Sequence, residues 1–153
     1  MTSTEDVVWI TKSYSELTVD ELYKLLRLRS EVFVVEQKCV FLDIDGNDQQ
    51  SHHCMGFIHG ELVAYTRLFG MNLIYDGYQT IGRVLTSMTQ RRTGLGKKLI
   101  EYSLAECTRL YGQGPIKIGA QYYLKNFYTS FGFIQCSDIY DEDGIDHIYM
   151  IKK

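Results

Sequence analysis

A glycine-containing segment from Arg91 to Gly96 (sequence RRTGLG) separates a strand-like run from a helix-like run in the middle of the chain. The run before it, 81–86, is apolar and β-branched, and the run after it, 95–111, has helical periodicity. A strand that turns through glycines into a helix N-terminus directs several backbone N–H groups and the positive end of the helix dipole toward one point. Glycine also lets the main chain approach an anion closely. The segment therefore predicts a site that holds a phosphate or pyrophosphate on its main chain.

Length and composition predict one domain over residues 1–153, with 45% hydrophobic and 23% charged residues. A net charge of −3 and a pI near 5.8 argue against a nucleic-acid partner or an anionic membrane surface. No apolar run approaches the roughly 18 residues that a membrane span needs. The segment from Met1 to Asp6 is polar and acidic and has no signal-peptide pattern, so we expect a cytoplasmic protein.

The cysteines, Cys39, Cys54, Cys107 and Cys136, are far apart and form no C-x-x-C pair. This spacing is typical of reduced cysteines in or near a core, and it favours neither a disulfide framework nor a zinc site.

The pattern of apolar and turn residues predicts a mixed α/β domain. Thr18 and Glu21 have the spacing of a capping box, which predicts a helix from there to about Phe33. A long loop is expected over 35–50. The later predicted elements are a hairpin (54–58 and 62–69) turning at His59-Gly60, a strand at 78–87, a helix at 95–111, a strand at 116–120, a short helix ending near 131, and strands at 133–137 and 145–151 around an acidic loop at 141–144.

A second motif, from Tyr128 to Phe133 (sequence YTSFGF), follows the glycine segment and ends in Gly-Phe. In this order and spacing, the two motifs resemble those of the GNAT superfamily of acetyl-CoA-dependent N-acetyltransferases. In that superfamily a Gln/Arg-x-x-Gly-x-Gly/Ala loop after the fourth strand holds the CoA pyrophosphate. Arg91, Gly94 and Gly96 stand at its defining positions.

The resemblance is closer still to the ElaA-like branch of that superfamily, and it covers nearly the whole chain. The segments that carry it are LR at 28–29 through FVVEQ at 33–37, IDGND at 44–48, His53, IGRV at 81–84, AQ at 120–121, EDGI at 142–145 and HI at 147–148. It implies a single-domain GNAT fold with a mixed, mostly antiparallel twisted central sheet flanked by helices. It also implies acetyl-CoA as co-substrate, but it does not imply a particular amine.

By this resemblance, the glycine loop and the strand before it hold acetyl-CoA. The residues so assigned are Val84, Leu85, Thr86, Arg91, Arg92, Thr93, Gly94, Leu95, Gly96, Lys97 and Gln121. Gln121 stands where GNAT enzymes often have asparagine, and Leu124 stands where a small residue is usual. A main-chain N–H near Leu85 or Thr86 is expected to polarise the thioester carbonyl. Tyr128 is expected to donate a proton to the departing thiolate.

The acceptor amine must lose a proton, because a lysine-like amine with a pKa near 10.4 is only about one part in 10³ deprotonated at pH 7. Glu36, His53 and His147 are the candidates for the base that takes this proton, since each lies in a segment resembling the ElaA-like branch. For each of them the alternative is a hydrogen-bonded structural role.

Two acidic segments, 43–48 and 141–146, are candidates for a ring that attracts a cationic amine, and a solvated surface is the alternative. The first segment is not a calcium loop, because its glycine falls at the fourth position and Cys54 stands where the last ligand should be. No metal is expected from Asp45, Asp48, His52 and His53, which lack a diagnostic spacing.

The sequence thus favours an N-acetyltransferase acting on a primary amine of a small molecule or peptide. Direct transfer is expected, because no cysteine adjoins a histidine in the motif region. One rival is a non-catalytic CoA-binding sensor or interaction module. Another is an acyltransferase that makes a signal molecule, because the region from Arg29 to Phe33 loosely resembles acyl-homoserine lactone synthases. The family resemblance is also compatible with a homodimer.

Overall fold

The computed structural model describes residues 6–153, so most of the polar N-terminal segment considered above lies outside the described residues. These residues form two four-stranded antiparallel sheets. The first has the order β1 (Val8–Ser13), β2 (His52–Ile58), β3 (Glu61–Phe69) and β4 (Thr80–Thr86). In the second, β8 (Ile145–Lys152) lies between β5 (Ile116–Gln121) and β6 (Ile134–Gln135), and it also pairs with β7 (Tyr140–Glu142).

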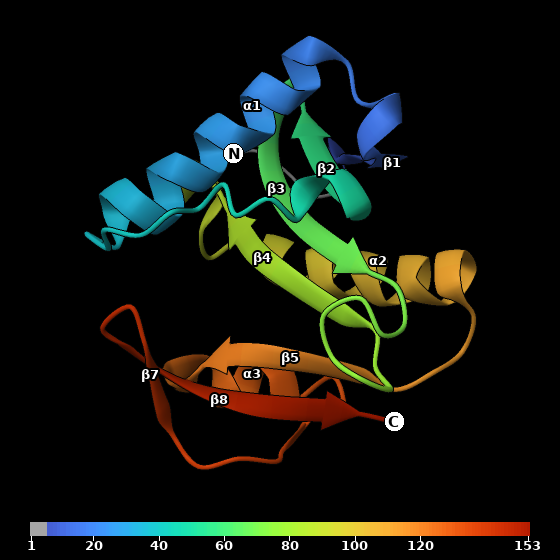
Figure 1. The fold of residues 1–153 in the computed structure, drawn as a ribbon. Helices are drawn as coiled ribbons and strands as arrows, with labels where there is room; N and C mark the ends of the chain where they lie inside the picture. The colour runs from blue at the N-terminus through green and yellow to red at the C-terminus, as the bar shows by residue number, and fades with distance from the viewer. Residues whose placement is uncertain (1–5) are drawn as a thin grey trace.

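The two sheets meet at one short parallel contact between Gln79 and Ile116. The Gln79 N–H donates to the carbonyl of Pro115 at 3.0 Å, and the Lys117 N–H donates to the carbonyl of Gln79 at 2.9 Å. Beyond this contact β4 and β5 diverge (Figure 1). The expected mixed, mostly antiparallel arrangement is therefore confirmed, although it is divided into two sheets.

Three α-helices flank the sheets: α1 (Val19–Arg29), α2 (Leu95–Tyr111) and α3 (Lys125–Thr129). The predicted capping box begins α1, since the Glu21 N–H donates to the Thr18 hydroxyl and the Thr18 N–H donates to the Glu21 carboxylate. The chain continues from α1 as a π-helix, η3 (Ser30–Glu36). The single-turn 3-10 helices are η2 (Tyr14–Glu16), η4 (Asp48–Gln50), η5 (Met88–Gln90) and η6 (Tyr122–Leu124).

The helices cover both faces of the first sheet. Leu25 and Leu28 of α1 pack with Met55 and Tyr65 on one face, and Leu95 and Leu99 of α2 pack with residues of β2 and β3 on the other. A third cluster joins α2 and α3 to the second sheet, and its buried members include Ile100, Cys107, Ile118, Tyr128, Phe133 and Ile148. Helix α2 packs against both sheets, and this packing holds the N-terminus of the helix beside the place where β4 and β5 diverge.

Several details differ from the sequence-based expectation. β1 is absent from the predicted elements, because it is an edge strand whose residues are nearly all half-buried and show no alternation. The expected acidic loop at 141–144 is partly strand, since β7 reaches Glu142 and turns through Asp143 (φ 51°) and Gly144 (φ 85°). All four cysteines are free, and Cys136 is exposed, unlike the other three.

Candidate functional site

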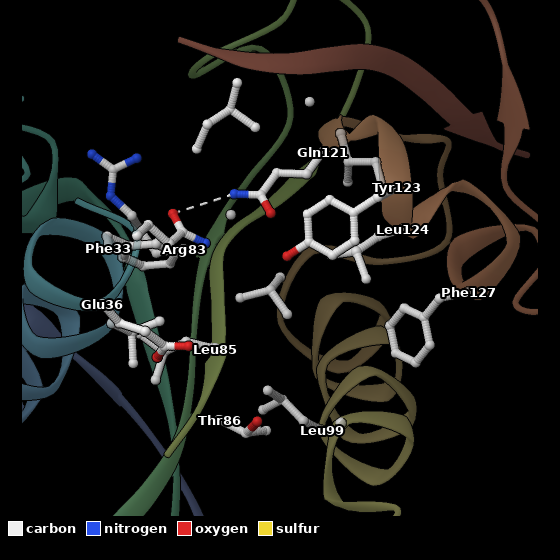
Figure 2. Close-up of a pocket in the computed structure, with 18 of the residues that line it drawn as sticks. Phe33, Glu36, Arg83, Leu85, Thr86, Leu99, Gln121, Tyr123, Leu124 and Phe127 are labelled. Carbon is white, nitrogen blue, oxygen red and sulfur yellow. Dashed lines mark hydrogen bonds between the residues drawn. The ribbon is translucent and has the colours of Figure 1, made fainter. Parts of the chain in front are cut away.

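A cleft of about 800 Å³ lies between the diverging strands β4 and β5. Figure 2 shows Glu36 and Leu85 on one side of it, facing Tyr123 and Phe127 on the other. The predicted site residues that line it are Glu36, Val84, Leu85, Thr86, Arg91, Arg92, Gly94, Leu95, Gly96, Gln121, Tyr128 and His147. The predicted residues that do not line it are His53, Thr93 and Lys97.

The main chain at the start of α2 has free hydrogen-bond donors. Within residues 6–153, no hydrogen bond uses the N–H groups from Arg92 to Lys97. Gly94 precedes the helix with a φ of 82° and no side-chain cap, and the first turn contains no acidic residue. A side chain added at Gly94 would project into open space, and one at Gly96 would meet only Phe127, at 3.9 Å. This arrangement suits a phosphate group held by the backbone.

Arg91 lines the cleft, but most of its donors are engaged within the protein. Its Nη1 and Nη2 donate to the two carboxylate oxygens of Glu36 at 2.7 and 3.0 Å, and Nη2 also donates to the carbonyl of Thr86 at 3.2 Å. The Arg91 N–H donates to the carbonyl of Met88. Both oxygens of Glu36 are therefore occupied, which disfavours Glu36 as the base that accepts a substrate proton.

Tyr128 is 6% exposed and enters the cleft from α3, with its ring edge-on to Phe127 and Phe133. Its hydroxyl makes no hydrogen bond to any residue of 6–153. Burial, with a smaller contribution from Tyr123, raises the pKa of the Tyr128 phenol well above its usual range. Near neutral pH this hydroxyl stays protonated, so it can donate a hydrogen bond and cannot serve as a base.

β4 contains a bulge beside the cleft. Tyr65 of β3 pairs with Leu85, whereas Arg67 pairs with Gly82, so β4 carries one extra residue between these pairs. Arg83 in this interval has a φ of 48°. A bulge increases the local twist of a strand, and the bulge residues Arg83 and Val84 both line the cleft.

Gln121, at the end of β5, spans the cleft. Its Nε2 donates to Oε1 of Gln37, which follows η3, at 3.4 Å, and the dashed line in Figure 2 marks this contact. A second contact also joins the segment after η3 to the second sheet: the Cys39 thiol donates to the carbonyl of Asp143, in the turn between β7 and β8, at 3.1 Å. Sequence reasoning did not identify Gln37 or Cys39 as cleft residues, although Gln37 ends the FVVEQ segment that carries the family resemblance and Cys39 follows two residues later.

The histidine candidates occupy different environments. His53 is 0% exposed, and its ring nitrogens lie against the hydroxyls of Ser51 and Tyr65 and the carbonyl of Asp48. The structure does not bring His53 to the cleft, so a base that touches substrate does not fit this position. His147 does line the cleft; its Nδ1 lies 2.8 Å from the carbonyl of Ile145, and its Nε2 lies 3.2 Å from Glu142.

The acidic segment 43–48 does not present free negative charge. Its aspartates form ion pairs with arginines from three distant elements, and the closest contacts are Arg29–Asp48 at 2.7 Å, Arg67–Asp45 at 2.8 Å and Arg83–Asp43 at 2.8 Å. Burial alone would raise the pKa of Asp45 and Asp48, but hydrogen bonds from these arginines hold both below their usual range. The interpretation of this segment as half of an acidic ring is therefore wrong, because its charge is compensated.

The second acidic segment remains uncompensated. Glu142 and Asp143 both line the cleft, and within 6–153 neither forms an ion pair with a lysine or arginine. Neither residue was predicted to be catalytic or to bind the cofactor, although the segment 141–146 that contains them was a candidate for the acidic ring.

In the described part of the chain, no group of three or more His, Cys, Asp or Glu side chains is arranged to hold a metal ion. No described helix has the length and apolar character to span a membrane.

Relatives of this chain match nearly its whole length and share its fold. Protein ElaA of Escherichia coli (strain K12) is 42% identical over 149 residues, which cover 96% of this chain and 97% of the relative. The crystal structure of E. coli ElaA superposes with a TM-score of 0.90 at 42% identity, covering 96% of this chain and 99% of that one. The crystal structure of an acyl-CoA N-acyltransferase from Pseudomonas aeruginosa superposes with a TM-score of 0.91 at 41% identity, with the same coverage of both chains.

A more distant likeness shows the fold alone. The CoA-dependent acyl-homoserine lactone synthase BjaI is 14% identical, with a TM-score of 0.77, and the match covers 95% of this chain and 82% of that one. The family described as "Acetyltransferase (GNAT) domain" matches residues 14–153 of this chain. By its sequence match, its close relatives and its fold, the chain belongs to the GNAT family of acetyltransferases.

Proposed function

We propose that the protein is an acetyl-CoA-dependent N-acetyltransferase that moves an acetyl group directly to a primary amine of a small molecule or peptide. The observation that carries this proposal is the uncapped start of α2, whose free N–H groups from Arg92 to Lys97 lie beside the cleft that Tyr128 enters. The name of the P. aeruginosa relative, an acyl-CoA N-acyltransferase, supports the same class of reaction.

The residues present fit a CoA thioester. The N–H groups of the loop and the positive end of α2 would hold its pyrophosphate, and Gly94 and Gly96 leave space for the close approach. The apolar side chains of Leu85, Leu99 and Phe127 would line the path of its arm through the cleft. The bound thioester would supply an activated acetyl group.

The side chains of the cleft would then act on the two reacting partners. A main-chain N–H at the end of β4, near Leu85 or Thr86, would donate to the carbonyl oxygen, a contact typically worth about 3 kcal/mol of barrier. Tyr128, held neutral by burial, would donate a hydrogen bond to the departing sulfur. Cys39 lines the cleft, but its thiol donates a hydrogen bond to the Asp143 carbonyl and burial raises its pKa, which disfavours an acyl-enzyme on this residue.

Binding of acetyl-CoA, measured by calorimetry, tests the proposal directly. We expect the unmodified protein to bind and Gly94→Asp to bind roughly 100-fold more weakly or not at all, because a carboxylate would face the pyrophosphate. Gly77→Asp is the matched control, since Gly77 has the same φ of 82° and open surroundings but lies outside the cleft. An unmodified protein that does not bind acetyl-CoA would refute the proposal.

A further inference from the structure

Glu142 and His147 form a pair of hydrogen-bonding groups on the second sheet. The turn at Asp143-Gly144 folds β7 back along β8, and both side chains line the cleft. Nε2 of His147 lies 3.2 Å from a carboxylate oxygen of Glu142. His147 is 7% exposed and stands opposite Gln121 of β5 and Tyr140 of β7.

The hydrogen bonds of this pair leave a place for a proton donor. The carbonyl of Ile145, 2.8 Å from Nδ1, can only accept a hydrogen bond, so Nδ1 carries the ring proton. In the neutral ring, Nε2 is then an acceptor that faces a carboxylate, which is also an acceptor. The 3.2 Å contact is satisfied either by a second ring proton on Nε2 or by a donor from which both groups accept. A protonated primary amine carries three N–H donors and one positive charge, which satisfies both groups.

The surrounding charges favour the same ligand. Glu142 and Asp143 have no lysine or arginine partner within residues 6–153. By contrast, the carboxylates of 43–48 on the other side of the cleft are each paired with arginine. The groups that face His147 include Glu142, Gln121 and the ring of Tyr140, whose centroid is 5.8 Å away, and none of these is a cation.

We propose that Glu142 and His147 together form the subsite that receives the ammonium group of the acceptor, with His147 as the group that takes its proton. This inference rests on the proposed amine acetylation. The ammonium R–NH₃⁺ gives one proton to Nε2, and Glu142 holds the resulting imidazolium. The nitrogen lone pair then forms the N–C bond to the acetyl carbonyl, and the C–S bond breaks with its electron pair on sulfur. The second amine proton passes to sulfur, and His147 releases the first to solvent.

Glu142 is 56% exposed in its side chain, so Glu142→Gln is expected to fold normally. Asp146→Asn is the matched control, since it removes the same charge from an exposed residue next to His147 that does not line the cleft. The first readout needs no turnover. The ring signal of His147 is followed by NMR while n-butylamine, or uncharged n-butanol of similar shape, is added to the free protein. Butylamine is expected to shift this signal in the unmodified protein and in Asp146→Asn, and the shift is expected to be lost in Glu142→Gln.

The second readout is steady-state acetylation at pH 8 with n-butylamine, which is charged, and hydroxylamine, which is uncharged. Glu142→Gln is expected to raise the KM for butylamine about three- to fivefold and to leave that for hydroxylamine nearly unchanged. If Glu142 had only a structural role, the substitution would change the KM for both substrates by the same factor. Equal shifts with butylamine and butanol, or an unaltered butylamine response in Glu142→Gln, would overturn the subsite. Failure of the proposed function is seen separately, as absent acetyl-CoA binding by calorimetry.

Discussion

Arg91 holds Glu36 by two charge-assisted hydrogen bonds, of 2.7 and 3.0 Å, and so links the glycine loop to the end of η3. The family motif places an arginine or glutamine at this position beside the pyrophosphate, and here its guanidinium binds a carboxylate of the same chain. The side chain of Arg91 therefore acts as a brace, and the main chain that follows it supplies the free donors.

Replacing Arg91 with glutamine tests this division of roles. We expect acetyl-CoA affinity to fall less than about tenfold, because the N–H groups from Arg92 to Lys97 remain in place. The free energy of unfolding should fall by no more than about 1 kcal/mol, because the two side chains are 41% and 28% exposed. Calorimetry and urea denaturation measure the two quantities. A loss of affinity as large as that in Gly94→Asp would contradict the brace.

Replacing Tyr128 with phenylalanine removes the buried hydroxyl and keeps the ring. We expect kcat to fall about 10²-fold or more, with the affinity for acetyl-CoA unchanged, because the hydroxyl acts only on the departing sulfur. Tyr122→Phe is the control, since Tyr122 is 40% exposed and does not line the cleft. If Tyr128→Phe keeps full activity, Tyr128 is a packing residue, and the case for a non-catalytic CoA-binding module becomes stronger.

Arg29 is a buried charge on which the loop 43–48 depends. It is 0% exposed, and its guanidinium donates to Asp43 and Asp48 at 3.0 and 2.7 Å. Arg29→Ala is expected to lower the free energy of unfolding by about 3–5 kcal/mol, because it removes a buried charge and leaves only Arg67 and Arg83 to compensate the aspartates of the loop. Arg27, two residues before Arg29, forms an exposed ion pair with Glu31. Arg27→Ala is the control, and it should lower the free energy of unfolding by less than about 1 kcal/mol. Equal losses in the two variants, in urea denaturation, would be inconsistent with this account.

The same network predicts how stability depends on acid. The arginines hold the folded-state pKa of Asp45 and Asp48 below the unfolded value near 3.9. Their stabilisation is therefore fully present above that value and is lost as the pH falls through the folded-state pKa values. We expect the free energy of unfolding to fall steeply below about pH 4. Asp48→Asn should be less stable at pH 7 and should show a shallower acid loss in denaturation curves between pH 7 and pH 3.

Local signals in the sequence specified much of this fold. The capping box at Thr18 and Glu21 gave the start of α1, and His59-Gly60 gave the β2–β3 turn, where both residues have positive φ. The glycine loop gave the start of α2 at Leu95. Each of these signals involves residues that are close in sequence. Local backbone geometry is therefore enough to determine where the helix begins or the turn forms.

The errors came from contacts between distant segments. The aspartates of 43–48 looked like free surface charge because their partners, Arg29, Arg67 and Arg83, lie on α1, β3 and β4. A signal was present, since Arg67 and Arg83 interrupt otherwise apolar strands, where a charge requires a partner. His53 and His147 could not be separated, because burial depends on which face of each strand the other elements cover.

The division of the strands into two sheets also bears on how the chain folds. The first sheet is a sequential meander from 8 to 86 in which β2, β3 and β4 follow one another through short connections, and the second lies wholly within 116–152. The β2–β3 pairing closes a short loop at low entropic cost, whereas the β1–β2 and β5–β8 pairings join strands that long segments separate, so we expect the β2–β3 hairpin to gain structure first. The walls of the cleft come from both sheets, and a short parallel contact joins them. The binding site is therefore expected to be the last part of the molecule to form, and an intermediate with either sheet alone would have no site for a ligand to stabilise.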